Sequence, residues 1–129
     1  MGLFDFFAPK KKVLPTRVAT LDDFRREVLE SKVPVILDVW SATCAPCRQL
    51  EPVLVEVATR YEGRVKVAEI SAAADPRVLV KLEVRSTPTL IMFEGGEEIG
   101  RASGYRPAAW FDDMIAAELL PAEDGREGA

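Results

Sequence analysis

Residues 35–48 read VILDVWSATCAPCR and contain both cysteines of the chain, Cys44 and Cys47. Apolar side chains dominate the first six positions, and so nearly unbroken a run predicts a strand covered on both faces, as in the middle of an α/β sheet. The Cys-x-x-Cys pair follows directly, at a strand-to-helix turn. Backbone N–H groups and the positive end of a helix dipole favour a thiolate there, and the thiolate is the species that attacks disulfides and binds metals. The stretch therefore predicts thiol–disulfide exchange.

The spacing of the two cysteines suits this chemistry. Positions three residues apart lie on one helix face, one turn apart, so the sulfurs are within disulfide reach. We expect Cys44, at the helix start, to be the exposed nucleophile and Cys47, one turn further in, to be the buried resolving thiol. Pro46 is tolerated between them because the first turn of a helix leaves its N–H groups unpaired in any case.

Three other interpretations of the pair are less favoured. A structural disulfide would close only four residues, and so short a loop gains about 2 kcal/mol from loop entropy. A zinc site would need two more ligands, whereas the chain has no other cysteine and no histidine. Two inert thiols near the surface are the third alternative.

Composition limits the remaining function classes. The chain has 129 residues, 48% of them hydrophobic and 29% charged, which is ordinary for one globular domain with its own core. We expect that domain to cover residues 13–120. A net charge of −4, with basic residues scattered among acidic ones, argues against binding to nucleic acid. The absence of histidine excludes Ser-His and Cys-His catalysis.

Both ends of the chain differ from the middle. Residues 1–12 form an apolar, then basic extension that we expect to be flexible, and residues 121–129 form a polar tail. No apolar stretch approaches the roughly 20 residues that a membrane helix needs, and the apolar residues precede the lysines, the reverse of a signal peptide. We therefore expect a cytoplasmic protein. Membrane contact through residues 3–12 is an alternative that so short a segment does not favour.

Periodicity and turn residues predict a mixed five-stranded sheet with helices on both faces. Helices between strands imply parallel pairing, and a hairpin at Gly95-Gly96 adds an antiparallel edge. Pro52 lies inside the second helix and predicts a kink there. The expected strands are residues 17–19, 35–40, 64–70, 89–93 and 98–103, and the expected helices are residues 20–31, 44–61, 75–83 and 108–120.

From Val18 to Leu120 the chain resembles the thioredoxin family. The resemblance is carried by Asp38 and Trp40 before the cysteines, by CAPCR at 44–48, by Pro52, by STPT at 86–89, and by Gly96 and Gly104. It implies a thioredoxin-like α/β fold and a protein-disulfide reductase without metal or bound cofactor. It also implies disulfide-containing protein substrates and a thioredoxin-reductase-type flavoprotein as electron donor. The residues it assigns to substrate binding are Trp40, Ala45, Pro46, Thr87, Pro88 and Gly104.

The resemblance gives Asp38 and Pro88 specific roles. Asp38 interrupts an apolar strand, so its pKa should be raised, and by resemblance it moves the proton of Cys47. An aspartate at a hydrated strand position is the alternative. Pro88 is expected to follow a cis peptide bond in a loop beside the cysteines, where the backbone pairs with an extended substrate segment. The alternative is a trans proline at a sheet edge.

Three residues depart from the family pattern. Thr43 stands where a second tryptophan is common, and Ala45 replaces the commoner glycine between the cysteines. Glu69 stands where the pattern usually has a basic residue. It either faces Asp38, in which case the two carboxylates raise each other's pKa, or faces solvent.

Thr43 and Glu69 keep a second function class open, a non-enzymatic adaptor or chaperone-type module that binds through the Phe-rich extension and the Pro88 loop. The retained cysteines argue against it. An oxidant or isomerase is a third reading, suited to an exported protein.

Overall fold

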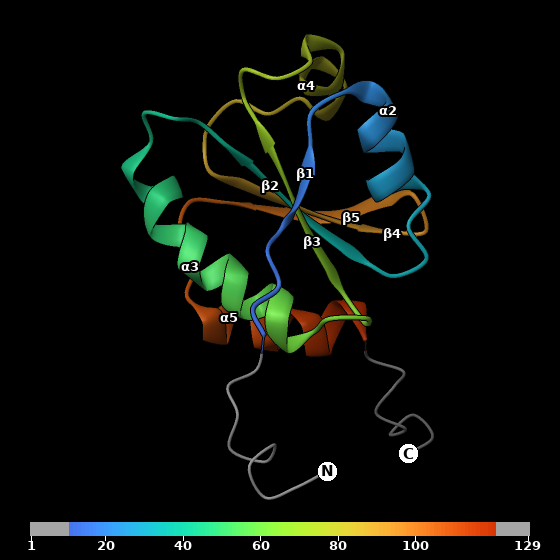
Figure 1. Cartoon of the computed structure of the whole chain (residues 1–129), viewed down its shortest axis with the longest axis vertical. Coiled ribbons are helices and arrows are strands. Elements are labelled where there is room, and N and C mark those ends of the chain that lie inside the picture. The colour runs from blue at the N-terminus through green and yellow to red at the C-terminus, as the bar shows by residue number, and fades with distance from the viewer. Residues whose placement is uncertain (1–10, 121–129) are drawn as a thin grey trace, which may run out of the picture.

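Five strands form one mixed sheet in the order β1-β3-β2-β4-β5, as Figure 1 shows. The computed structural model describes residues 11–120, so most of the expected extension and the whole of the expected tail lie outside it. β3 pairs in parallel with β1 and β2, while β4 runs antiparallel to both β2 and β5. The strands are β1 (Thr16–Val18), β2 (Val35–Trp40), β3 (Lys66–Ser71), β4 (Thr89–Glu94) and β5 (Glu97–Ser103).

The helices alternate with the strands in the predicted order. α2 (Leu21–Phe24) continues as a π-helical turn, η1 (Arg25–Leu29), and α5 (Ala108–Met114) continues likewise as η2 (Ile115–Leu119). Between them lie α3 (Ala45–Arg60), which runs on through Pro52, and α4 (Pro76–Leu82). The predicted elements are therefore confirmed, with bounds shifted by one or two residues at most ends.

One prediction about pairing was wrong, because β4 follows a helix and yet runs antiparallel to β2. A parallel pairing would require the connection to return along the full length of the sheet. α4 has only seven residues, or about 10 Å of helix, which is too short to span a six-residue strand of about 20 Å. The chain therefore enters β4 from the end at which β3 finished.

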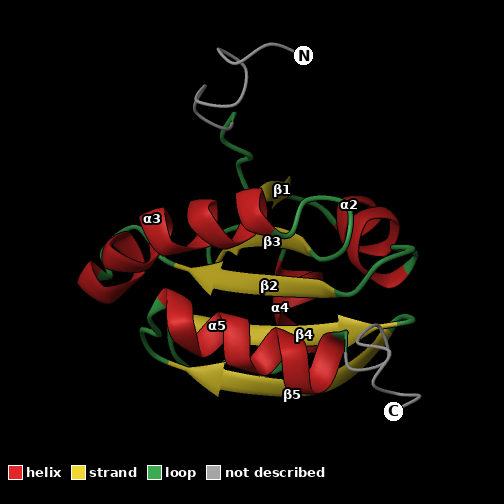
Figure 2. Ribbon diagram, turned by 90° about the horizontal axis from the view of Figure 1, so that it is seen from below, coloured by secondary structure: helices red, strands yellow, loops and turns green. Residues whose placement is uncertain are grey.

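Helices cover both faces of the sheet (Figures 1 and 2). Alternate side chains of β2 separate the two cores: Val35, Leu37 and Val39 pack with α2 and α4, and Ile36 packs with α3 and α5. Asp38 has the same parity as Ile36 and therefore lies on the α3 face. This alternation places the one charged residue of β2 beneath the helix that carries the cysteines.

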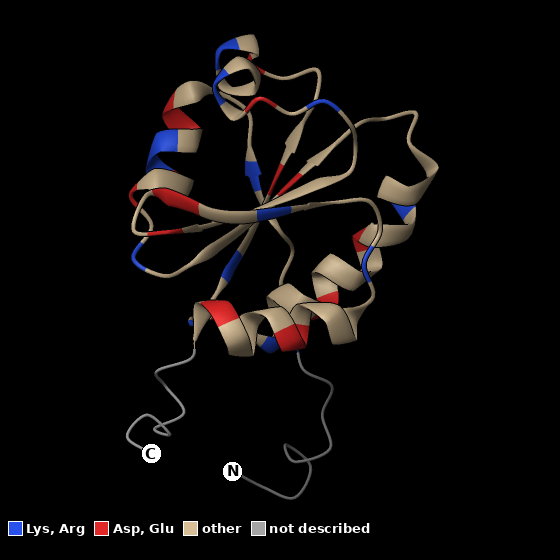
Figure 3. Cartoon of the chain, turned by 180° about the vertical axis from the view of Figure 1, so that it is seen from behind, with Lys and Arg blue, Asp and Glu red and all other residues tan. Residues whose placement is uncertain are grey.

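Local signals explain where helices and turns occur. The Thr20 hydroxyl accepts the N–H of Asp23 at 3.1 Å and starts α2. Gly95 and Gly96 both have positive φ, +61° and +85°, as the two-residue hairpin between β4 and β5 requires. Basic and acidic positions are interspersed along α2 with η1 and along α3 (Figure 3), and Arg25 and Arg26 each pair with an aspartate one turn earlier in α2.

Candidate functional site

Cys44 and Cys47 are joined by a disulfide at the start of α3, with their Cα atoms 5.2 Å apart. Cys44 has extended backbone dihedrals and occupies the N-cap position, and its Sγ accepts the N–H of Cys47 at 3.1 Å. Cys44 is partly exposed, whereas Cys47 is only 3% exposed. The same N–H and the helix dipole would stabilise a thiolate on Cys44 after reduction.

The Thr87–Pro88 loop lies directly beside Cys44. The peptide bond between Thr87 and Pro88 is cis, as expected, and the carbonyl oxygen of Thr87 lies 3.5 Å from Cys44 Sγ. The hydroxyl groups of Ser41 and Thr87 are 3.2 Å apart, which links this loop to the end of β2. The loop is thus held against the redox pair from both sides of the strand-to-helix turn.

Gly104 supports this loop from β5. Its N–H donates to the carbonyl oxygen of Pro88 at 2.8 Å, and its φ is +91°, a conformation that favours glycine. Ala45 and Pro46 are exposed at the start of α3, and Trp40 is partly exposed at the end of β2. Thr87 therefore lies beside Cys44 and Gly104 is bonded to the following Pro88, while Ala45 and Pro46 directly follow Cys44 in the chain and Trp40 ends the strand before it.

Asp38 is 3% exposed, so the alternative of a hydrated aspartate is wrong. Its Oδ1 has no hydrogen-bond partner among residues 11–120. Burial, reinforced by the nearby carboxylates of Glu69 and Glu51, raises the pKa of Asp38 to about 7. A buried carboxyl group with this pKa can both take up and release a proton near neutral pH.

Glu69 faces Asp38, which decides between the two orientations left open above. The two residues are direct partners in the parallel pairing of β2 with β3 and point to the same side. The indole N–H of Trp40 donates to Glu69 Oε1, and Nε of Arg17 lies 3.6 Å from Glu69 Oε2. The Glu69 carboxylate is therefore held by one hydrogen bond, from Trp40, and by an ion pair with the exposed Arg17, although the family pattern usually has a basic residue there.

Glu51 is a site residue that the sequence analysis missed. It lies in α3, four residues after Cys47 and directly before Pro52, and together with Asp38 and Glu69 it lines a pocket of about 400 Å³. The i, i+4 spacing from Cys47 was the available signal, because such positions share a helix face. An exposed glutamate on a helix has the appearance of ordinary solvated surface, so the signal was weak.

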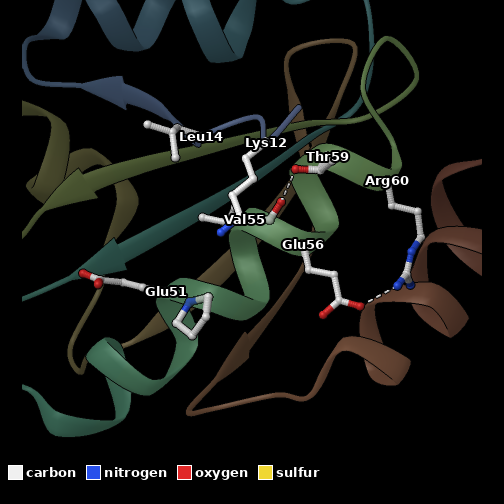
Figure 4. Close-up of a pocket in the computed structure, with 8 residues that line it drawn as sticks. Lys12, Leu14, Glu51, Val55, Glu56, Thr59 and Arg60 are labelled. Atoms are coloured by element: carbon white, nitrogen blue, oxygen red, sulfur yellow. Dashed lines mark hydrogen bonds and ion pairs between the residues drawn. The ribbon is translucent and has the colours of Figure 1, made fainter. Parts of the chain in front are cut away.

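A larger hollow of about 740 Å³ lies between α3 and the chain before β1 (Figure 4). Glu51 stands at one end of it, and Glu56 and Arg60 stand at the other. Neither cysteine nor Asp38 lines this hollow, so its size does not make it the redox site.

Residues 11–120 offer neither a metal site nor a membrane-spanning helix. No group of three or more His, Cys, Asp or Glu side chains there could hold a metal ion. No helix of that part of the chain is long and apolar enough to cross a membrane.

Comparisons with known proteins agree on one family. The thioredoxin family model matches residues 15–117. The chain is 42% identical over 96 residues to thioredoxin 1 of Nostoc sp., which covers 74% of this chain and 90% of that protein. It is 36% identical over 105 residues to thioredoxin C-2 of Corynebacterium nephridii, covering 78% of this chain and 97% of that protein. The crystal structure of a thioredoxin from Malassezia sympodialis (Mala s 13) superposes with a TM-score of 0.73 at 18% identity, covering 84% of this chain and 93% of that one, and so shares the fold.

Proposed function

The chain belongs to the thioredoxin family and is a thiol–disulfide oxidoreductase, and from this premise we propose that it reduces the disulfides of protein substrates, with Cys44 and Cys47 as the reacting thiols and Asp38 as the proton relay. The observation that carries the proposal is the position of the Cys44–Cys47 pair, at the N-terminus of α3 and beside the Thr87–Pro88 loop. An exposed sulfur at a helix start and a buried one a turn later suit attack and resolution respectively.

In the first step the Cys44 thiolate attacks one sulfur of the substrate disulfide. A bond forms between Cys44 and that sulfur, the substrate S–S bond breaks, and the other substrate sulfur leaves as a thiolate. The N–H of Cys47, 3.1 Å from Cys44 Sγ in the oxidised pair, supports this step because it stabilises the attacking thiolate.

In the second step the Cys47 thiol loses its proton to the Asp38 carboxylate and attacks Cys44. The Cys44–Cys47 disulfide forms, and the second substrate sulfur leaves as a thiolate, which takes a proton from the solvent. Asp38 then releases the proton that it accepted. Its pKa of about 7 supports this role, because such a group exchanges a proton at neutral pH in either direction.

The Thr87–Pro88 loop is the proposed binding edge for the substrate. An extended peptide segment could pair with the backbone of Thr87, which is partly exposed, next to the sulfur it presents to Cys44. Gly104 holds the loop through the Pro88 carbonyl, and Trp40, Ala45 and Pro46 form the adjacent surface. Thr43 contributes a smaller side chain to this surface than a tryptophan would, which should weaken apolar contacts with partners.

We further propose that a thioredoxin-reductase-type flavoprotein supplies two electrons for each turnover and restores the dithiol. The protein would then carry electrons from this donor to its disulfide substrates. The cytoplasm is the compartment in which we expect the cycle, because thiols are kept reduced there and a dithiol can act as a reductant.

Reduction of insulin disulfides with NADPH and thioredoxin reductase tests the proposal. Turnover should be lost in Cys44→Ser, and Cys47→Ser should accumulate a mixed disulfide with the substrate because attack occurs without resolution. Cys44→Ser should trap no substrate. Capture of the same partners by both variants would instead support the alternative function of a non-enzymatic adaptor, since binding would then not depend on the nucleophile Cys44.

A further inference from the structure

Asp38 lines the pocket of about 400 Å³ that lies between the sheet and α3, on the side of β1. The redox reaction described above uses the Asp38 carboxyl group but leaves the pocket itself without a role. Its polar lining consists of the carboxylates of Asp38, Glu51 and Glu69 and the guanidinium of Arg17. The pocket therefore presents three acidic groups against one basic group.

The charges of the pocket are only partly paired. The indole N–H of Trp40 donates to Glu69 and Arg17 forms an ion pair with it, so that carboxylate already has partners within the protein. Glu51 takes part in none of the ion pairs within residues 11–120, and Asp38 Oδ1 has no hydrogen-bond partner there. A buried carboxyl group without a partner is costly, and Asp38 lines the pocket, so a donor that reaches this carboxyl group from the pocket would offset that cost.

The other residues that line the pocket limit which chemical group can bind there. Leu14, Leu54 and Val55 form apolar walls, and the Trp40 side chain adds an aromatic surface on which a cation is favoured. A metal ion does not fit, because no set of three or more ligating side chains within the described residues could hold one. A positive group on an aliphatic stem fits both the walls and the carboxylates.

We propose that this pocket binds a primary alkylammonium group, with the ammonium between Asp38 and Glu51 and the alkyl chain against Leu14 and Val55. The ammonium offers three donors to the unpaired carboxylate oxygens, and charge-assisted hydrogen bonds of this kind are stronger than neutral ones. The ligand is either a free amine or the lysine side chain of a bound protein, which present the same chemistry to the pocket.

Binding should be coupled to the protonation of Asp38. The charged groups that face Asp38 are Glu69 from β3 and Glu51 from α3, and Arg17 from β1 is paired to Glu69. Because the ammonium favours the ionised carboxylate, it competes with the proton. Given a pKa of about 7 for Asp38, affinity should rise up to about tenfold between pH 6 and pH 8. Reciprocally, a bound ammonium should release the proton from Asp38.

The test is a titration of the full-length oxidised protein with n-butylammonium chloride at constant ionic strength, followed by amide NMR shifts and by tryptophan fluorescence, to which both Trp40 and Trp110 contribute. Because no turnover is involved, its result is independent of the proposed reductase function. We expect saturable 1:1 binding that is tighter at pH 8 than at pH 6, and no comparable response to 1-butanol. Nα-acetyl-lysine methylamide separates the two sources: equal binding indicates that a lysine attached to a backbone can enter, and its exclusion indicates a free amine.

Three variants assign the site. Glu51→Gln should weaken n-butylammonium binding at least fivefold, and Asp38→Asn should also remove the pH dependence. Glu62→Gln is the matched control, since it removes the same charge from a residue outside the pocket and should bind as the parent does. A linear response equal to that of sodium chloride would overturn the proposal. Unchanged binding in both Glu51→Gln and Asp38→Asn would also overturn it, because the ammonium would then lie elsewhere on the surface.

Discussion

Glu69 lies directly opposite Asp38 in the parallel pairing of β2 with β3, so two carboxylates occupy neighbouring positions on the face covered by α3. Glu69 accepts a hydrogen bond from Trp40 and forms an ion pair with Arg17, whereas Asp38 Oδ1 has no partner within residues 11–120. Glu69 therefore acts on Asp38 as a fixed negative charge. Like charges at short range disfavour ionisation, so this strand neighbour adds to the effect of burial.

Glu69→Gln should lower the pKa of Asp38 below 7. The amide keeps an acceptor for the Trp40 indole and removes the negative charge, so the change is close to purely electrostatic. The measurement is a titration of the Asp38 side-chain carboxyl carbon by NMR in the oxidised protein, where neither cysteine titrates. Glu62→Gln serves as the control and should leave the titration where it was. An unchanged Asp38 titration in Glu69→Gln would mean that burial alone sets this pKa.

Asp38→Asn should raise the free energy of unfolding, and by more at pH 8 than at pH 4. An aspartate whose folded pKa is raised costs no stability below the unfolded value of about 3.9, because both states are then protonated. As the pH rises from about 3.9 to 7, the unfolded state loses its proton first and stability falls. The rise of the Asp38 pKa to about 7 corresponds to a loss of at most about 4 kcal/mol in the free energy of unfolding.

Urea unfolding at pH 4 and pH 8 measures this difference. The parent and the variant share every other titrating group, so subtracting their free energies isolates position 38. A buried amide without partners would shift both values equally and leave the pH dependence intact. Equal gains at the two pH values would show that Asp38 ionises as freely in the folded state as in the unfolded one.

The central features of fold and site could be predicted because they depend on local patterns. The apolar run of β2, the cysteine spacing and the turn at Gly95 and Gly96 each reflect one short stretch. The direction of β4 could not be predicted this way, because it depends on where the short helix α4 delivers the chain.

The surroundings of Asp38 needed the structure for a different reason. Strand periodicity predicts that Glu69 points to the opposite face from its chain neighbours, but only the register of β3 with β2 shows that it lies beside Asp38. Glu51 depends on how α3 lies across the sheet, a tertiary relationship with no counterpart in a local pattern. The three carboxylates come from three separate elements, so no single segment of sequence contains the cluster.

Gly96→Ala should destabilise the protein more than Gly95→Ala. Both glycines have positive φ, so each alanine is strained by about 1 kcal/mol. A Cβ at Gly96 would also lie 2.9 Å from the carbonyl oxygen of Leu29, whereas a Cβ at Gly95 would meet nothing within 4 Å. The adjacent position thus provides the control for backbone strain.

Thermal unfolding of the two variants measures the contact. We expect Gly96→Ala to lose a further 1–3 kcal/mol, about the cost of forcing an overpacked contact. Redox activity should persist in both folded variants, since this hairpin lies away from Cys44 in sequence and contributes no residue to the site. Equal destabilisation of the two variants would mean that the backbone at Leu29, the end of η1, moves aside at little cost.

Cys44 should react with iodoacetamide before Cys47 once the pair is reduced. Cys44 is partly exposed and has the N–H of Cys47 directed at its sulfur, whereas Cys47 is 3% exposed and deeper in α3. The rate should therefore follow the thiolate of Cys44, with a pKa below the free value of about 8.5. Peptide mapping by mass spectrometry at several pH values identifies the modified residue. Cys44→Ser is the control and should be alkylated slowly, because only the buried thiol is left. Equal labelling of the two thiols in the parent would contradict the assignment of nucleophile and resolving cysteine, since both would then be equally accessible and equally acidic.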